Sequence, residues 1–174
     1  MTRIFDPLHG FIAITPLMKQ FIDTEEFQRL RDLKQLGATV FVFPSANHTR
    51  FEHSIGVSHL AGLMVESLKK NGYSIDERTI ELIRIAGLLH DIGHGPFSHL
   101  YDDYVKNESI PEHEERGCQI IRKMVERYDI NITGEEVNEV IKMINPGEEE
   151  KYIWKYQIVA NKINQLDVDK LDYI

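Results

Sequence analysis

The chain contains 174 residues, of which 28 are acidic and 20 are basic, and its formal net charge is −8. This balance argues against a nucleic-acid-binding protein, because such proteins gain much of their affinity by neutralising phosphates. The length and a hydrophobic content of 42% fit one globular domain, which we take to span residues 1–174. The longest apolar stretches are too short to cross a bilayer, and the single cysteine excludes an internal disulfide, so we expect a cytoplasmic protein.

The first predicted helix begins at the sequence Asp23-Thr24-Glu25-Glu26, where acidic side chains face the positive end of the helix dipole. Its apolar stripe is formed by Phe27, Leu30 and Leu33. The run at residues 39–43 is rich in β-branched and aromatic side chains, which predicts either an extended segment or a buried connection. Strand signals are otherwise scarce.

A long helix is predicted over residues 49–70, with Gly72 as its stop signal. Ser74 and Glu77 have the spacing of a capping box and predict a further helix that leads to His90. The side chains expected to face inward are Ile55, Leu60, Leu63, Met64 and Val65 in the first of these helices, and Ile80, Ile83, Ala86 and Leu89 in the second.

Three helices are predicted in the remaining part of the chain. One covers residues 112–128, and the next follows Thr133, whose capping-box partner is Glu136. The last holds Trp154 and continues toward Asp169. Because helical periodicity dominates the chain, the predicted fold class is all-α.

The segment HDIGHGPFSH at residues 90–99 carries the main chemical signal. It ends an apolar helix, and the break after His90 and Asp91 lets the backbone turn so that several polar side chains can converge. Imidazole and carboxylate together suit a divalent ion such as Fe, Mn, Zn or Ni, with Mg also open. Adjacent residues on a helix point about 100° apart, so this pair needs ligands from other helices.

Two other segments carry suitable ligands. His53 lies on the long predicted helix, and the segment DVDKLDY at residues 167–173 brings carboxylates, a lysine and a tyrosine together. The predicted metal ligands are His53, His90, Asp91 and Asp169, which leave positions for water and a phosphate oxygen. Each ligand also has a structural interpretation, as a core histidine or a paired carboxylate, and Asp167 and Asp172 are rivals of Asp169.

Short motifs along nearly the whole chain resemble the HD-domain phosphohydrolases. Within that superfamily the chain is similar to the deoxynucleoside triphosphate triphosphohydrolases, including those that join a sterile-alpha-motif domain to an HD domain. The motifs are FDPLHG at 5–10, FQRLR at 27–31, KQLG at 34–37, RFEHS at 50–54, and the segments at 90–99 and 167–173. The resemblance implies an HD-domain helical bundle around a divalent metal, with the relatives continuing for a further helical region.

The resemblance also implies a reaction, the hydrolysis of a dNTP to a deoxynucleoside and inorganic triphosphate. His53, His90, Asp91 and Asp169 fall on the family's metal ligands. Beside the scissile phosphate the matching histidines are His94 and His113; His113 is the expected proton donor, and Glu114 could orient it. The positions that match contacts to the triphosphate are Arg50, His99 and Lys170, the contact to the sugar is Tyr173, and the deoxynucleoside pocket is matched by Gln35 and Leu36.

Several alternatives stay open. The chain could be an HD nucleotidase of different substrate range, or a regulatory or inactive module that binds metal and nucleotide. Asp23, Gln28 and Arg31 match positions that bind a guanine nucleotide in regulated relatives, although they also fit a solvated amphipathic helix. The expected partners are a dNTP and further copies of this chain, as a homodimer or higher oligomer, and neither nucleic acid nor a membrane. His9, His48 and His59 are expected to be structural.

Overall fold

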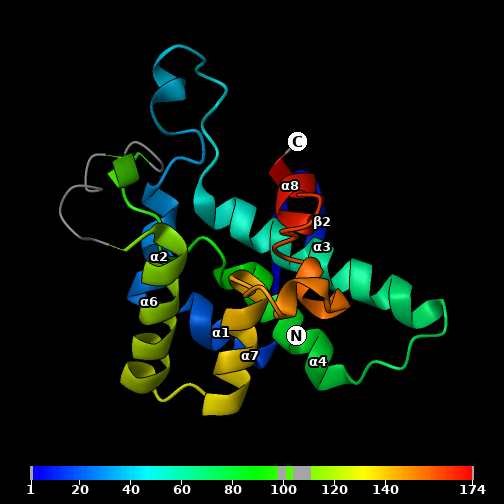
Figure 1. The fold of residues 1–174 in the computed structure, drawn as a ribbon. Helices are drawn as coiled ribbons and strands as arrows, with labels where there is room; N and C mark the ends of the chain where they lie inside the picture. Colours follow the sequence, from blue (N-terminus) through cyan, green and yellow to red (C-terminus); the bar gives the residue numbers. More distant parts are fainter. Residues whose placement is uncertain (1, 98–100, 104–110, 174) are drawn as a thin grey trace.

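The computed structural model describes residues 2–97, 101–103 and 111–173 (Figure 1). Helices dominate this part of the chain, which confirms the predicted all-α class, and one small antiparallel sheet is added to them. None of the helices in these ranges is both long and apolar enough to cross a membrane. The predicted phosphate contact His99 lies outside the described residues.

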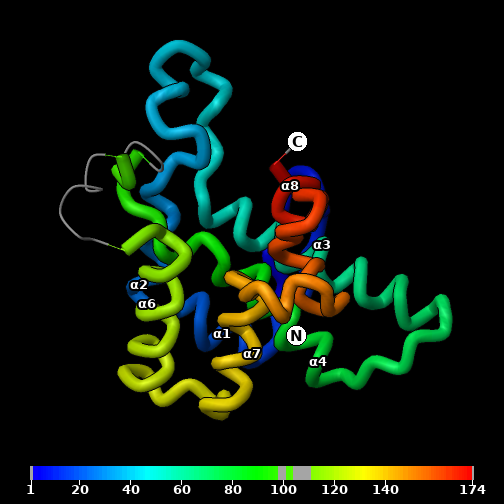
Figure 2. The backbone as a smooth tube through the Cα atoms, in the orientation of Figure 1, coloured from blue at the N-terminus to red at the C-terminus, as the bar shows by residue number. Residues whose placement is uncertain are grey.

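The centre of the fold is an antiparallel pair of helices, α3 (Arg50–Lys70) and α4 (Glu77–Leu89), which turn back on each other in Figure 2. The predicted long helix is confirmed, and its capping box is formed by Thr49 and Glu52. The second helix is capped by Asp76, whose side chain accepts the Thr79 N–H, rather than by the predicted Ser74. Asp76 immediately precedes the first helical residue, which is the position from which a short carboxylate reaches the unsatisfied N–H groups.

The inward face of α3 differs from the prediction at two positions. Val57, Ala61 and Val65 are fully buried and form a stripe at intervals of four residues, whereas Leu63 and Met64 are 53% and 36% exposed. The four side chains predicted to face inward from α4 are all buried, namely Ile80, Ile83, Ala86 and Leu89. Residues 53–58 are buried without interruption, so the first half of α3 is enclosed, whereas its second half contacts the core through one face.

Two further helices close the core. The helix α6 (His113–Tyr128) matches its predicted range, and α7 (Gly134–Ile144) begins at the predicted capping box of Thr133 and Glu136. Helix α7 packs against both α4 and α6. Its apolar positions Val137, Val140 and Ile144 are buried, as the helical spacing predicts.

The N-terminus forms a β-hairpin that the sequence analysis missed. Strands β1 (Thr2–Asp6) and β2 (Gly10–Ile14) pair in antiparallel register, with Phe5 opposite Phe11. The carboxylate of Asp6 accepts the backbone N–H groups of Leu8 and His9 at 2.8 and 2.9 Å, which fixes the turn. The signal in the sequence was limited to the turn-forming Asp-Pro pair and the short apolar run at residues 11–14.

After the hairpin come α1 (Pro16–Ile22) and α2 (Glu25–Gln28), the latter a single turn that continues as a 3₁₀ turn at Arg29–Asp32. The next segment contradicts both predicted alternatives for residues 39–43. It contains a 3₁₀ turn at Gly37–Phe41, and Phe41, Val42 and Phe43 are 82%, 74% and 61% exposed. This segment projects from the top of the molecule in Figure 1.

The last predicted helix is also corrected. Trp154–Gln157 is a 3₁₀ turn, and helical structure returns only at α8 (Val168–Tyr173). Between them, Asn161 donates its backbone N–H to Asp167, and the same carboxylate accepts the N–H of Lys170 at 3.0 Å. Asp167 thus caps α8, and this turn brings α8 against α3.

Candidate active site

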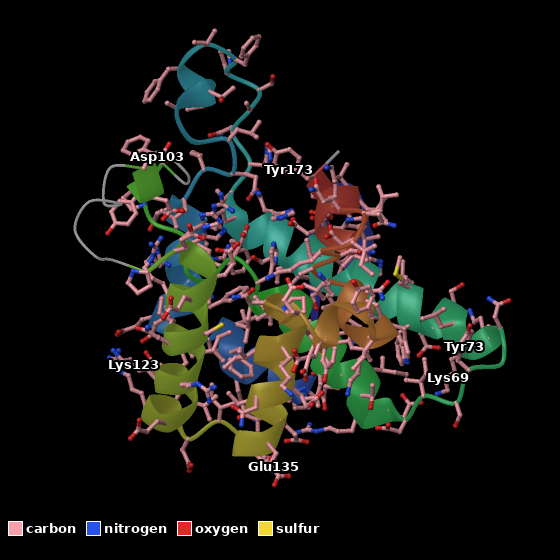
Figure 3. The ribbon with its side chains drawn as sticks, in the orientation of Figure 1. Lys69, Tyr73, Asp103, Lys123, Glu135 and Tyr173 are labelled. Carbon is pink, nitrogen blue, oxygen red and sulfur yellow. The ribbon has the colours of Figure 1, made fainter. Side chains whose placement is uncertain are left out.

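A pocket of about 410 Å³ lies where α3, α4, α6 and α8 meet. Its wall contains most of the predicted site residues, which come from segments far apart in sequence: Gln35, Arg50, His90, Asp91, His94, His113, Glu114, Asp169, Lys170 and Tyr173. In Figure 3 the labelled Tyr173 lies at α8, beside the pocket, whereas Lys69 and Tyr73 lie at the other end of α3. His53 lies behind the wall in contact with Asp169, and Leu36 is not among the lining residues.

Three of the four predicted metal ligands form one group. Ligand atoms of His53 on α3, His90 at the end of α4 and Asp169 on α8 all lie within 4.8 Å of one another. The Nε2 atom of His53 is 2.9 Å from Oδ1 of Asp169, and Nε2 of His90 is 3.4 Å from the same oxygen. The expectation that several helices supply the ligands therefore agrees with the geometry.

Both imidazoles present Nε2 to the centre of this group. The Nδ1 atom of His90 lies 2.8 Å from the carbonyl oxygen of Gly87, to which it can only donate, and Nδ1 of His53 lies 2.8 Å from Oδ2 of Asp172. Within the described part of the chain, the buried Nε2 of His90 has no hydrogen-bond partner. A buried nitrogen of this kind, beside a carboxylate, fits a metal ion, because an unsatisfied buried polar atom is otherwise costly.

The fourth predicted ligand, Asp91, borders the group. One carboxylate oxygen forms an ion pair with the buried guanidinium of Arg50 and lies 3.8 Å from Nε2 of His53. The other lies 3.4 Å from His90 and 3.3 Å from Nε2 of His94. Burial raises the pKa of Asp91, but the neighbouring histidines and Arg50 lower it more, so its pKa falls well below the usual value.

The electrostatic balance of this group favours a cation. Burial alone lowers the pKa of His90, but the carboxylates of Asp91 and Asp169 reverse this effect and raise the pKa to about 9. The pKa of His53 is raised as well, because its bonds with Asp169 and Asp172 outweigh its burial. A set of imidazole nitrogens and carboxylate oxygens is the donor set that first-row divalent ions prefer. These residues therefore could hold a metal ion, as an HD domain does.

A second group of side chains lies beside the first. The rings of His94 and His113 stack with their centroids 4.0 Å apart. The Nδ1 atom of His113 is 3.0 Å from Oδ2 of Asp102, and Asp102 also pairs with Arg116. Burial raises the pKa of Asp102, but the contact with Arg116 lowers it by a larger amount. The pKa therefore falls below its usual value, and the carboxylate stays charged. The three side chains are close enough to hold an ion, yet Arg116 already neutralises Asp102.

Asp102 was missed by the sequence analysis, which proposed Glu114 as the residue that orients His113. The structure places Glu114 on the other side of the ring, with Oε1 3.5 Å from Nε2. Spacing in the sequence does not identify Asp102, because its contact depends on how α6 docks. The only available signal was an acidic pair, Asp102-Asp103, shortly after the segment at 90–99.

The backbone between the two groups is held by two arginines. Arg29 donates to the carbonyl oxygens of Ile92 and His94 at 2.7 and 2.8 Å, and Arg116 donates to that of Gly93 at 3.1 Å. Gly93 also lets α6 approach, because a Cβ there would overlap the His113 carbonyl oxygen and lie 2.9 Å from the Cα of Gly117. These contacts set the position of His113 relative to His94.

The predicted substrate contacts surround these groups. Arg50 is buried, while Lys170 and Tyr173 line the mouth of the pocket from α8. Gln35 is 7% exposed, and its Oε1 has no hydrogen-bond partner in the described ranges. A buried polar atom at a pocket wall is suited to bind a ligand hydroxyl.

The positions that match a regulatory nucleotide site have local contacts instead. Arg31 donates to Oε1 of Gln28 at 2.8 Å, and its guanidinium lies 3.5 Å from the ring centre of Phe51. Asp23 pairs with Lys19 one helical turn away. These contacts agree with the solvated-helix interpretation.

Comparisons with known proteins bear on the same residues. Residues 50–174 match the family described as HD domain. This range includes all the predicted metal ligands. The chain is 42% identical to the deoxynucleoside triphosphate triphosphohydrolase SAMHD1 homolog of Dictyostelium discoideum over 98% of its own length and 35% of that protein. It is 40% identical to SAMHD1 of Homo sapiens over 99% of its own length and 32% of that protein.

A viral protein shows a similar degree of likeness. The chain is 42% identical to the putative HD domain-containing protein L394 of Acanthamoeba polyphaga mimivirus, covering 96% of this chain and 40% of the viral protein. The chain thus spans about a third of the length of the first two relatives. The region matched by these two relatives, unlike the family match at residues 50–174, contains the N-terminal hairpin as well as both histidine groups.

Proposed function

This chain belongs to the HD-domain family, and from that premise we propose that it is a metal-dependent phosphohydrolase that acts on deoxynucleoside triphosphates. The observation that carries the proposal is the pocket in which a metal-ligand group, a buried arginine and a stacked histidine pair meet. The names of the relatives from Dictyostelium and human supply the substrate class. The motifs that resemble this family support the same class.

The ion would be held by Nε2 of His53, Nε2 of His90 and the carboxylate of Asp169, with Asp91 completing the sphere. When bound, a divalent ion such as Mn or Fe polarises a phosphate oxygen and lowers the pKa of a coordinated water. Asp91 has a second task, because it holds Arg50 in place by an ion pair. Arg50 and Lys170 then supply positive charge for the triphosphate.

In the reaction a water oxygen would form a bond to the α-phosphorus and release a proton to the surrounding water, and the bond from that phosphorus to the 5′ oxygen of the deoxynucleoside would break. The departing oxygen takes a proton from Nε2 of His113. Asp102 accepts from Nδ1 of the same ring at 3.0 Å, so it would orient the ring with Nε2 toward the departing oxygen. His94 stacks on His113 and keeps the ring in this orientation.

The remaining residues would select the sugar. Tyr173, which lines the pocket, would pack on the ribose, and Gln35, with Leu36 next to it, would contact the deoxynucleoside where a 2′-hydroxyl is excluded. His99 belongs to the same proposal as a phosphate contact. Within the described ranges the buried Oε1 of Gln35 has no hydrogen-bond partner, which supports a contact with a donor group of the base or with the 3′-hydroxyl.

The test is a hydrolysis assay of the Mn²⁺-loaded chain with dNTPs, NTPs and monophosphates. We expect release of inorganic triphosphate from dNTPs, and a loss of about 10²- to 10⁴-fold in rate for His113→Gln with its metal content unchanged. Lys123→Gln is the control, because Lys123 is exposed on the same helix (Figure 3).

Other outcomes separate the alternatives. Preferred turnover of monophosphates would indicate a nucleotidase instead. One metal ion per chain with nucleotide binding and no turnover would indicate a binding module. Release of triphosphate from none of the substrates contradicts the proposal.

A further inference from the structure

The turn of the N-terminal hairpin contacts the metal-ligand group through Asp172. The Nε2 atom of His9 lies 2.7 Å from Oδ1 of Asp172, and Nδ1 of His53 lies 2.8 Å from Oδ2 of the same carboxylate. The side chain of Asp172 is only 6% exposed, so these contacts are shielded from solvent. One carboxylate on α8 therefore joins a hairpin residue to a candidate metal ligand.

The directions of these hydrogen bonds determine where the protons lie. An ionised carboxylate can only accept, so both His9 and His53 donate to Asp172. Because Nδ1 of His53 is bound to Asp172, Nε2 is the nitrogen that would bind a cation, in place of the hydrogen bond that it forms with Asp169 at 2.9 Å. Carboxylates in this position orient metal-bound histidines in many proteins.

The two candidate histidine ligands are held in different ways. His90 donates from Nδ1 to the main-chain carbonyl of Gly87 within its own helix. His53 depends on the side chain of a residue 119 positions away. In the sequence analysis Asp172 is a rival of Asp169 for the ligand role. The structure places the two carboxylates at different ring nitrogens of His53, Asp172 at Nδ1 and Asp169 at Nε2.

The backbone around Asp172 is shaped to hold the carboxylate there. A Cβ at Gly56 of α3 would lie 2.7 Å from Cγ of Asp172, so only glycine leaves room for the carboxylate at this position. On the other side, Asp6 accepts the backbone N–H of His9 at 2.9 Å and fixes the turn from which the His9 side chain projects.

We propose that Asp172 and His9 are positioning residues that hold the His53 ring in the orientation in which Nε2 faces the metal site. The hairpin, which lies outside the HD-domain match at residues 50–174, then becomes part of the metal centre. This inference rests on the proposed function, because it requires an ion at His53, His90 and Asp169.

The experiment measures binding of Co²⁺ alone to the metal-free full chain, by chelator competition and by the visible absorption bands of the bound ion. Asp172→Asn is expected to weaken Co²⁺ binding about ten- to a hundredfold and to change the bands, because outer ligands orient inner ones. Gly56→Ala is expected to act similarly, since it displaces the carboxylate without removing it. His9→Ala is expected to weaken binding about tenfold, with partial recovery in His9→Gln, whose amide can still donate.

Two matched controls report on unrelated effects of the substitutions. Gly62→Ala lies on the same helix, where a Cβ meets only the Arg84 side chain, and His48→Ala removes an exposed histidine. Both are expected to bind Co²⁺ as the unchanged chain does. Thermal unfolding of each metal-free variant identifies any that fails to fold. If Asp172→Asn fails to fold, the test uses His9→Gln, which is the mildest change.

The outcomes distinguish this inference from the proposed function. If the unchanged chain binds Co²⁺ and the folded Asp172, Gly56 and His9 variants bind it equally well with the same bands, the inference is wrong and the metal centre stands. If the unchanged chain binds no Co²⁺, both are wrong. Recovery in His9→Gln supports a hydrogen bond, whereas equal loss in both His9 variants contradicts the positioning role of His9.

Discussion

The two histidine groups that face the pocket are assembled over very different distances along the chain. His53 meets Asp169 and Asp172 across 116 and 119 residues, whereas His113 meets Asp102 across 11 residues. The first group depends on the whole fold closing, and the second depends on the docking of α6 against the segment that follows α4. Apart from Asp91, which lies against both His90 and His94, the proposed metal ligands and the proposed proton donor depend on separate contacts, so we expect that each can be disrupted without the other.

The largest expected effect comes from Gly93→Ala, which breaks the local group. The added Cβ would overlap the main-chain oxygen of His113, which cannot rotate away as a side chain could. We expect a loss of about 3 kcal/mol in the free energy of unfolding and displacement of α6. Urea unfolding measures this loss. Gly134→Ala is the control, because nothing lies within 4 Å of its added Cβ, and equal stability of the two variants would contradict the close packing.

A smaller effect is expected from Arg116→Ala, which weakens the local group without adding atoms. Arg116 pairs with Asp102 and donates to the carbonyls of Gly93 and Pro111. We expect a rate about tenfold lower, because a loosened Asp102 leaves His113 less well oriented, with Co²⁺ affinity unchanged. The exposed Arg122→Ala on the same helix should behave as the unchanged chain. A parallel loss of Co²⁺ affinity in Arg116→Ala would mean that the two groups are not separable.

The smallest effect is expected at an ion pair remote from both groups. Arg78 on α4 binds Glu136 on α7 through two hydrogen bonds of 2.6 and 2.9 Å, and chiefly this contact lowers the pKa of Glu136 from 4.5 to about 2. Because the pKa of Glu136 is lower in the folded state, its ionised carboxylate stabilises that state above pH 4.5. This contribution to the free energy of unfolding is lost as the pH falls from 4.5 toward 2.

The pair is partly exposed, so its contribution is about 1 kcal/mol. Glu136→Gln is therefore expected to be less stable by about this amount at pH 6, and the difference should vanish near pH 2 in urea unfolding. Glu135→Gln, at an exposed neighbouring position, should show no such dependence. A difference that stays constant with pH would contradict the lowered pKa.

Much of the fold follows from patterns that act within one or two helical turns. The capping box at Thr133 and Glu136 and the helix at residues 49–70 are local features, and the structure confirms both. The same local logic fails at residues 39–43, whose β-branched and aromatic side chains predict an extended segment or a buried connection. There the 3₁₀ turn leaves three apolar side chains in solvent, and nothing in the segment itself encodes that outcome.

The site was predictable in its residue types but not in its supporting contacts. His53, His90 and Asp169 were chosen because imidazole and carboxylate ligands from several helices suit one ion, and their ligand atoms do converge. Asp102 and Asp172 were not identified as supports of the histidines, because their roles depend on how distant helices dock. Glycines such as Gly93 determine that docking through the space they leave open, which no periodicity reveals.

The contact between His9 and Asp172 also has a consequence for the timing of biosynthesis. The two residues are 163 positions apart, and at about 5 to 20 residues per second a ribosome needs about 8 to 33 seconds to add that length of chain. During this interval the hairpin and α3 can form, but Asp169 and Asp172 do not yet exist. The candidate metal site is therefore completed only when α8 has been synthesised, so we expect any ion to bind after the chain has closed.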